Sequence, residues 1–498
     1  MIGYVDEANA LHIRGWAADP DDFQHTLNVE VLIDGSVVAT AAAGHCRPDL
    51  EHAGFGTGHH GFDCTLPVLD LRRGDVDFQV RIQGTDVVLP FGSTCPSRLD
   101  LSIFIDVLAV DIVNNCNLRC PFCMVDYSGV DKTELMTEET FLSLLRLMPH
   151  VPDGGFWLSC LHEPTLHPRM DRFLSLIPSD SRKKVVFTTN LARPLPEKTF
   201  ESWAASGLKH INISFDTINP DLFAVLRKFG KYSVFENNLR SLVRAFQQHA
   251  NPPLLRYITT AFRSSAGEIP VLVRRCHEEF LASECEIRSV YNTQNIPDDF
   301  RQSEFLRSSD WSALTAAMAN VPYRYNICYP HDNQHVQVVA ANRFDFDPPD
   351  EELQHFIRPL YLRARPDGTL RVAESEFDCR FRVNVHDLED PARFFYDRLE
   401  NISAGWLRGH IEEVNPDSVI GRALDRNDLT RSLIVELWLN GQLSATARTA
   451  AHNRFVFPLF AGMVPATGKV TAQVRVQGTE YKVPFRSSTR FEVTLPSS

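Results

Sequence analysis

Between residues 104 and 291, the sequence alternates short apolar runs with amphipathic segments, and this succession limits the fold more than any other feature. Strands that alternate with helices are typical of a parallel α/β arrangement, because each helix returns the chain to the starting edge of the sheet. Six such units predict an open barrel whose functional residues lie at the carboxyl ends of the strands. The expected strands cover residues 104–113, 155–160, 184–189, 209–215, 254–260 and 286–291.

The two ends of the chain carry two copies of one β-rich module. Residues 80–85 (VRIQGT) recur as residues 474–479 (VRVQGT), and a gapless match relates residues 15–40 to residues 421–446. Alternating apolar and polar residues, with turn residues between the runs, predict an antiparallel β-sandwich. The first copy has a histidine- and glycine-rich insertion at residues 47–61, which we interpret either as a ligand-binding loop or as an elaborated surface turn.

A chain of 498 residues is too long for one ordinary core, so several domains are expected. We predict an α/β protein in which a partial (β/α)6 barrel is flanked by N- and C-terminal β-sandwich modules. The predicted boundaries are residues 1–97 for the first module, 98–300 for the barrel, 301–410 for a bridge and 411–498 for the second module.

Three cysteines, Cys116, Cys120 and Cys123, follow the first expected strand with the spacing C-x3-C-x2-C. Thiolates this close together in a reduced chain share one metal ion or one cluster. A structural zinc site needs four ligands, so either a distant residue such as Cys160 or His162 completes the site, or one coordination position stays open for chemistry.

Polar residues also stand where later strands end. Glu163 follows the second expected strand, Asn190 the third, and Ser214 and Asp216 the fourth. Because the carboxyl ends of parallel strands share one edge of a sheet, these side chains are expected to gather near the thiol loop.

Together, these features resemble the radical S-adenosylmethionine (SAM) enzymes over about residues 104–291, including an aromatic residue, Phe122, directly before the third cysteine. The resemblance implies that Cys116, Cys120 and Cys123 bind three irons of one [4Fe-4S] cluster and that SAM chelates the fourth. One electron from the reduced cluster would then cleave SAM and release a 5'-deoxyadenosyl radical. The resemblance also implies a flavodoxin- or ferredoxin-type electron donor.

The family pattern assigns roles to further residues. Phe122 would lie against the adenine of SAM, and Glu163 would bind the amino group of its methionine part, although Leu161 and His162 replace the two glycines of the family's Gly-Gly-Glu motif. Asn190 matches a Thr-x-Asn-Gly strand end without the glycine. Ser214 would reach the ribose or the carboxylate of SAM within a Ser-Leu-Asp-like strand end that also contains Asp216, and Arg227 would pair with the carboxylate.

Each of these residues also has an ordinary structural interpretation. Phe122 would pack in a core, Glu163 would cap a helix, and Arg227 would lie on a helix surface. Asn190 and Asp216 would be turn formers, as asparagine and aspartate at strand ends often are. His167, Arg263 and Tyr291 are further candidates to face a substrate.

The bridge resembles a degenerate SPASM or twitch extension. Its expected hairpin at Pro366-Asp367-Gly368 has Ala373 where the family pattern has a cysteine, and Cys328 and Cys379 are too few for an auxiliary cluster. We interpret the acidic run at residues 345–352 as a solvated loop. The bridge is therefore expected to lack iron and either to help form the substrate pocket or to serve as an ordinary linker.

The end modules resemble small β-sandwich domains attached to glycan-related enzymes, so a sugar or glycan is one expected substrate. A peptide side chain is the alternative substrate, and a zinc-stabilised scaffold that binds glycans or proteins is the non-enzymatic alternative. The net charge of -13 argues against wide contact with nucleic acid or an anionic membrane. Without a membrane-spanning stretch or a secretion signal, the protein is expected to be cytoplasmic. The resemblance to radical SAM enzymes implies that it is also oxygen-sensitive.

Overall fold

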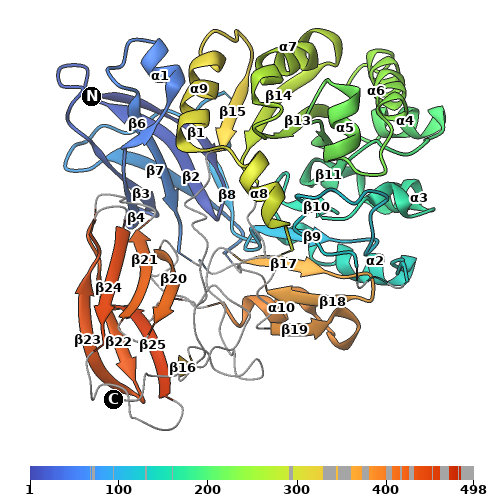
Figure 1. Ribbon diagram of the computed structural model, residues 1–498. Coiled ribbons are helices and arrows are strands. Elements are labelled where there is room, and N and C mark those ends of the chain that lie inside the picture. Colours follow the sequence, from blue (N-terminus) through green and yellow to red (C-terminus); the bar gives the residue numbers. More distant parts are fainter. Residues whose placement is uncertain are drawn as a thin grey trace.

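The computed structural model describes residues 1–67, 69, 73–93, 95–128, 130, 132–159, 161–290, 295–328, 344–345, 360–372, 381–399, 407–415, 418–425, 431–450, 453–459, 470–479 and 482–483. A large α/β sheet with its helices forms one side of the molecule, and antiparallel sheets from the two ends of the chain lie together on the other side (Figure 1).

The central sheet has ten strands in the order β15-β14-β13-β12-β11-β10-β9-β17-β18-β19. The six strands expected from the sequence are neighbours in chain order and all parallel, which confirms the α/β class. The predicted bounds of the last one, 286–291, were wrong, because the strand covers Ala282–Arg288. Glu284 and Glu286 within it form ion pairs with Arg256 of the neighbouring strand. The first six strands are β9 (Val107–Val110), β10 (Phe156–Leu158), β11 (Val185–Thr189), β12 (His210–Ser214), β13 (Leu254–Thr260) and β14 (Ala282–Arg288).

Strands from the bridge extend this sheet. β17 (Tyr361–Ala364) pairs in parallel with β9, and β18 (Thr369–Val372) and β19 (Phe381–Asn384) continue from it in antiparallel order. Gly368, with a φ of 84°, forms the expected turn between β17 and β18. β15 (Tyr325–Cys328) adds a parallel strand beyond β14. Ala373, Cys379 and most of the acidic run at 345–352 lie outside the described residues.

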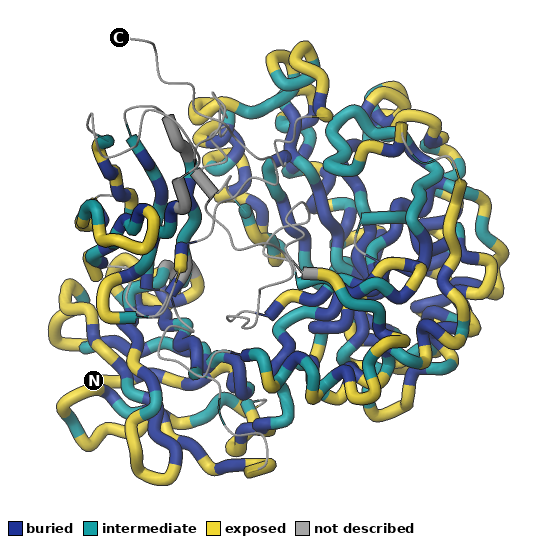
Figure 2. Tube along the Cα trace, turned by 90° about the horizontal axis from the view of Figure 1, so that it is seen from below, coloured by how far each residue is buried: buried dark blue, intermediate teal, exposed yellow. Residues whose placement is uncertain are grey.

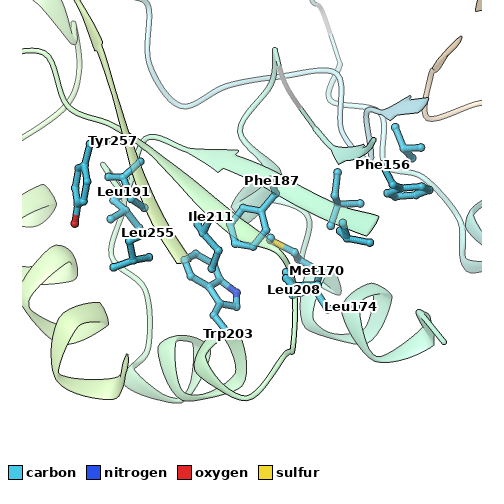
Figure 3. Close-up of a cluster of buried hydrophobic side chains, with 14 of the residues drawn as sticks. Phe156, Met170, Leu174, Phe187, Leu191, Trp203, Leu208, Ile211, Leu255 and Tyr257 are labelled. Atoms are coloured by element: carbon cyan, nitrogen blue, oxygen red, sulfur yellow. The ribbon is translucent and has the colours of Figure 1, made fainter. Parts of the chain in front are cut away.

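Helices connect the parallel strands, and the core lies between them and the sheet. Thr137 caps α2, since its hydroxyl accepts a hydrogen bond from the Thr140 amide. Figure 3 shows Trp203 of α4 against Phe187 of β11, with ring centroids 4.9 Å apart. The described helices are α2 (Glu138–Leu145), α3 (Met170–Leu176), α4 (Glu197–Ala204), α5 (Pro220–Leu226), α6 (Tyr232–Gln247), α7 (Ile269–Glu279), α8 (Asp298–Glu304), α9 (Ser308–Met318) and α10 (Pro391–Tyr396).

The N-terminal module consists of two sheets, β1-β2-β6-β5 and β4-β3-β7-β8, which share one hydrophobic cluster. The insertion at residues 47–61 contains a short helix, α1 (Pro48–His52). The strands are β1 (Ile2–Ala8), β2 (His12–Ala18), β3 (Asn28–Ile33), β4 (Ser36–Ala42), β5 (His45–Cys46), β6 (His59–Thr65), β7 (Asp75–Ile82) and β8 (Arg98–Asp100).

The C-terminal module also has two sheets, β20-β21-β24 and β16-β25-β22-β23, around its own cluster. In the tube of Figure 2, buried residues alternate with less buried ones along its strands. The strands are β16 (Phe344–Asp345), β20 (Leu407–Asn415), β21 (Ser418–Asp425), β22 (Ile434–Leu439), β23 (Gln442–Arg448), β24 (Arg454–Pro458) and β25 (Val470–Val476). The domain boundaries at 97, 300 and 410 remain predictions.

The two copies repeat a specific contact. A Cβ atom added at Gly15 would lie 2.7 Å from the Phe62 ring, and one added at Gly421 would lie 2.5 Å from the Phe455 ring. Gly15 pairs with Val5 on the neighbouring strand, and Gly421 pairs with Ile411. In both copies the register of strand pairing shifts directly after that partner residue. The recurring glycine thus leaves room for an aromatic ring that packs across the sheet.

Among the described residues, no helix is long and apolar enough to cross a membrane.

We predict that Gly15→Ala destabilises the N-terminal module by about 1–3 kcal/mol, because the added methyl group would overlap both the Tyr4 carbonyl and the Phe62 ring. Hydrogen exchange of peptides from β1 and β2, followed by mass spectrometry, should show faster exchange. Gly44→Ala is the control, since its nearest neighbour would be 3.6 Å away. Equal exchange in both variants would contradict the prediction.

Candidate functional site

The three cysteines lie in the loop that leaves the carboxyl end of β9, and all three are half-buried. The Asn115 side chain accepts a hydrogen bond from the Cys116 amide at 2.8 Å. The Leu118 amide donates to Cys116 Sγ at 3.4 Å, and the Cys123 amide donates to the Cys120 carbonyl at 3.0 Å. These bonds curl the loop back on itself, so that the thiols come near enough to influence one another electrostatically.

Burial makes the thiols of Cys116 and Cys120 hard to ionise in the absence of a metal, since it raises the pKa of both. It raises the pKa of Cys116 to about 12, and the nearby Glu163 contributes to this rise. Burial raises the pKa of Cys120 to about 11, although Arg227 opposes the rise. Since thiolates are the ligand form, metal binding here would release protons.

Glu163 lies at the carboxyl end of β10 and is 2% exposed. Its Oε1 accepts hydrogen bonds from the Thr165 amide at 3.2 Å, the Thr165 hydroxyl at 2.7 Å and the Thr189 hydroxyl at 2.8 Å. Its Oε2 accepts from the Asn190 amide at 2.8 Å. Burial raises the pKa of Glu163, while these donors oppose the rise. Glu163 thus caps the 3₁₀ helix Pro164–Leu166, as its structural interpretation predicts; its contact with SAM remains a prediction.

Asn190 joins Glu163 to the thiol loop. Its side-chain amide donates to Cys116 Sγ at 3.5 Å and to Asn117 Oδ1 at 3.0 Å, while its backbone amide binds Glu163. It also makes the expected local turn, because its Oδ1 accepts from the Ala192 amide at 2.8 Å. The end of β11 is therefore fixed directly against Cys116.

Leu191 occupies the position at which the family pattern has glycine. Its φ is 51°, a conformation that favours glycine, and the side chain is 1% exposed. Asn238 of α6 donates to the Leu191 carbonyl at 2.8 Å and helps to hold this turn. Asn238 was not expected from the sequence, where it appears only as a polar residue beside the apolar stripe of a helix.

Asp216 and Arg227 form a buried ion pair of 2.6 Å, with side chains 0% and 11% exposed. The Thr260 amide donates to Asp216 Oδ1 at 2.9 Å. The alternative that Arg227 is a helix-surface residue is therefore wrong. Its guanidinium lies 5.4 Å from the centroid of the Phe122 ring and close enough to Cys120 to affect its thiol.

Phe122 packs against Phe262, with ring centroids 4.6 Å apart, and joins a small hydrophobic cluster that includes Leu226. The contacts of Phe122 thus agree with the interpretation that it packs in a core, and its contact with adenine remains a prediction. Ser214 lies half-buried at the end of β12, as expected.

A cluster of polar side chains near the carboxyl end of β9 was not predicted from the sequence. Arg363 of β17 donates to Asp111 Oδ2 at 2.8 and 2.9 Å, and His162 Nε2 lies 3.9 Å from the same oxygen. His162 Nδ1 is 3.0 Å from the Tyr127 hydroxyl. Burial lowers the pKa of His162; Asp111 opposes this effect, whereas Arg363 and Arg365 add to it. Asp111 lies within the first expected strand, but its partner is 252 residues away, so no local pattern could reveal the pair.

The zinc alternative finds little support in these contacts. Both ring nitrogens of His162 face other protein groups, and Cys160 lies outside the described residues. In the described part of the chain, no group of three or more His, Cys, Asp or Glu side chains could hold a single metal ion. A four-iron cluster does not require such a group, because each thiolate binds a different iron and the sulfurs stand farther apart than around one zinc.

Two of the other substrate candidates, His167 and Arg263, are engaged in contacts within the protein. His167 is buried, with Nε2 3.0 Å from the Met136 carbonyl and Nδ1 accepting from the Arg169 amide. Arg263 donates to the carbonyls of Gln302 and Phe305 and so supports the region of α8. Tyr291 lies outside the described residues.

An open cavity of about 460 Å³ lies over the hairpin of β18 and β19. Three arginines reach it, and one of them, Arg365, is close enough to His162 to influence its charge. The lining residues are Arg365, Asp367, Thr369, Arg371, Arg382, Val383, Asn384 and Asp387.

Residues 110–258 match the sequence model of the Radical SAM superfamily. This segment is thus a radical SAM domain. The predicted class, radical SAM enzyme, and the implied cofactors, a [4Fe-4S] cluster and SAM, are confirmed at the level of this superfamily.

The chain is similar to several GTP 3',8-cyclases. The one from Crocosphaera subtropica is 29% identical over 162 residues, which make up 31% of this chain and 46% of that protein. The probable GTP 3',8-cyclase of Methanocaldococcus jannaschii is 23% identical over 204 residues, 39% of this chain and 66% of that protein. The chain spans less than half the length of the first of these relatives. Among solved structures, SuiB of Streptococcus suis bound to S-adenosylmethionine matches with a TM-score of 0.40 and 14% identity over 59% of this chain and 64% of that one.

We predict that Glu163→Gln lowers the free energy of unfolding of the iron-free protein by about 1–3 kcal/mol, because one carboxylate oxygen becomes an amide that faces donors. Urea unfolding measures this effect without any cofactor. Glu197→Gln is the matched control, since that side chain is 68% exposed. Equal stability of the two variants would show that the hydrogen bonds of Glu163 are not a structural requirement.

Proposed function

We propose that this protein is a radical SAM enzyme in which Cys116, Cys120 and Cys123 hold one [4Fe-4S] cluster with an open iron for SAM. The observation that carries the proposal is the position of the three thiols, in one half-buried loop at the carboxyl end of β9, within the segment that matches the superfamily. The site residues in this proposal follow from family positions and from the contacts around the loop.

The surroundings of the loop fit this pair of cofactors. Arg227 Nε is a buried donor and Asp111 Oδ1 a buried acceptor, and each lacks a hydrogen-bond partner among the described residues. A buried polar atom without a hydrogen-bond partner is costly, and a carboxylate ligand could supply the partner that Arg227 Nε lacks. Arg227 would hold the carboxylate of SAM, and Ser214 would contact the carboxylate or the ribose.

When bound, the cluster and SAM supply a 5'-deoxyadenosyl radical that abstracts a hydrogen atom from the substrate. The chain's own residues do the positioning. Asn190 fixes Cys116, and the Asp216 carboxylate orients Arg227 beside Cys120. Phe122 would cover the adenine, and Glu163 would hold the loop in place, with its contact to the amino group of SAM as a further proposed role.

For the substrate, we propose an anionic molecule that contains a sugar. Arginines recognise phosphate and carboxylate groups in paired hydrogen bonds, and three of them line the cavity over β18 and β19 together with two aspartates. One of the three, Arg365, also acts on the charge of His162. The relatives are named for a reaction of GTP, and GTP is itself an anionic molecule that contains a sugar. Modification of a peptide side chain is the second candidate. We place the reaction in the cytoplasm, whose reducing conditions keep such thiols reduced.

The decisive experiment is anaerobic reconstitution. We expect about four irons and four sulfides per chain, and 5'-deoxyadenosine from SAM under dithionite. Cys123→Ala should reduce this product to background, because one iron loses its ligand. Cys95→Ala, outside the loop, should retain full activity. A colourless protein with one zinc ion, or cleavage that persists in Cys123→Ala, would overturn the proposal.

The substrate class can be tested with the same product. GTP and nucleotide sugars should accelerate 5'-deoxyadenosine formation, whereas uncharged sugars should not, because only the former engage the arginines. Arg382→Ala should weaken the acceleration by about tenfold, as loss of a charge-assisted pair does. Acceleration by a peptide and not by any nucleotide would favour the second candidate.

A further inference from the structure

The turn between α5 and α6 exposes an unusual amount of apolar surface. Phe229 is 72% exposed and Val225 is 61% exposed, more than any other large hydrophobic side chain among the described residues. Lys228 and Lys231 are exposed beside them. We name Val225, Lys228, Phe229 and Lys231 the Phe229 patch.

The backbone at the centre of the patch is strained. Phe229 has a φ of 76°, a conformation that costs a residue with a Cβ roughly 1–3 kcal/mol. The chain is held there by the bond from the Gly230 amide to the Arg227 carbonyl at 2.7 Å. Burial of the ring does not offset this cost, since most of the ring faces solvent. Asparagine or glycine would fit the turn better, so stability alone does not explain a phenylalanine here.

The patch adjoins the thiol loop. The Arg119 amide donates to the Lys228 carbonyl at 3.0 Å, and Arg119 directly precedes Cys120. A Cβ atom at Gly230 would lie 3.1 Å from the Leu118 side chain. This hydrogen bond thus joins Lys228 of the patch to the residue directly before Cys120, a proposed ligand of the cluster.

The charge of the patch is opposite to that of the whole protein. The chain carries a net charge of -13, whereas the patch contributes two lysines. Lys228 Nζ lies 5.7 Å from the centroid of the Phe229 ring, so charge and apolar surface form one continuous area. Asp221 on α5 is exposed nearby in the sequence and only partly offsets this charge. A basic rim around an aromatic residue suits an acidic protein partner.

We infer that the Phe229 patch docks a small acidic one-electron carrier protein of the flavodoxin or ferredoxin type. This inference rests on the proposed function. The reduced carrier is oxidised by one electron, and that electron passes over the short path through the turn to the cluster held by the thiol loop. The carrier then leaves and is reduced again by its own reductase.

The test compares two reductants in one assay, 5'-deoxyadenosine formation from SAM by the reconstituted full-length protein. Dithionite is small and needs no docking surface, whereas an acidic flavodoxin kept reduced by its reductase needs one. The patch variants are Lys228→Glu/Lys231→Glu and Phe229→Asn, the latter because asparagine tolerates the positive φ. Lys183→Glu/Lys209→Glu is the control, with the same change of charge before β11 and β12, at the opposite edge of the sheet.

With dithionite, all variants should match the unmodified protein. With flavodoxin, the double charge reversal should raise the KM for flavodoxin about tenfold at low salt, and the difference should shrink as salt screens the charges. Phe229→Asn should raise it at all salt concentrations, because the apolar contact is not screened.

Each other outcome has a definite meaning. Equal flavodoxin dependence in the patch and control variants would overturn the docking site. Loss of activity with both reductants would show that the turn supports the thiol loop and does not dock a donor, which also overturns it. If the unmodified protein makes no 5'-deoxyadenosine under dithionite, the proposed function itself fails.

Discussion

The site depends on one buried carboxylate. An ionised carboxyl group inside a protein is costly unless hydrogen bonds compensate it, and Glu163 receives four of them from residues of two strand ends. These bonds fix the end of β10 to the end of β11. Asn190 then extends the connection to Cys116, so the thiol loop is held by the same network. Loss of this carboxylate would leave two backbone amides and two hydroxyls without their acceptor.

The bridge contributes to the site because one of its strands, β17, joins the barrel sheet beside β9. β17 pairs with β9 in parallel and places Arg363 on Asp111. Arg365, at the turn that follows, also acts on the charge of His162. The bridge thus supplies two positive charges close to His162.

The two end modules share their framework and differ on one surface. Next to the recurring glycine, β1 and β2 of the first copy pair Tyr4 with Trp16. At the same place in the second copy, β20 and β21 pair His410 with Arg422. The Tyr4 and Trp16 rings are 6.0 Å apart, and Phe55 from the insertion lies 5.0 Å from Trp16. Arg422 instead contacts Glu412. The core of the module is conserved within the chain, while the exposed faces have diverged from aromatic to charged.

The sequence by itself determined the class of the barrel, its strand order and the thiol loop, because these are encoded in local periodicity and in the spacing of Cys116, Cys120 and Cys123. It also indicated that Glu163 and Asn190 lie at strand ends. Only the tertiary structure decided what they contact, since a carboxylate that caps a 3₁₀ helix and one that binds a ligand look the same in a sequence. The pairs Asp111–Arg363 and Asp216–Arg227, and the joining of β17 to β9, depend on chain segments that folding alone brings together. Long-range pairing leaves no local pattern, and for that reason the surroundings of the thiols became visible only in three dimensions.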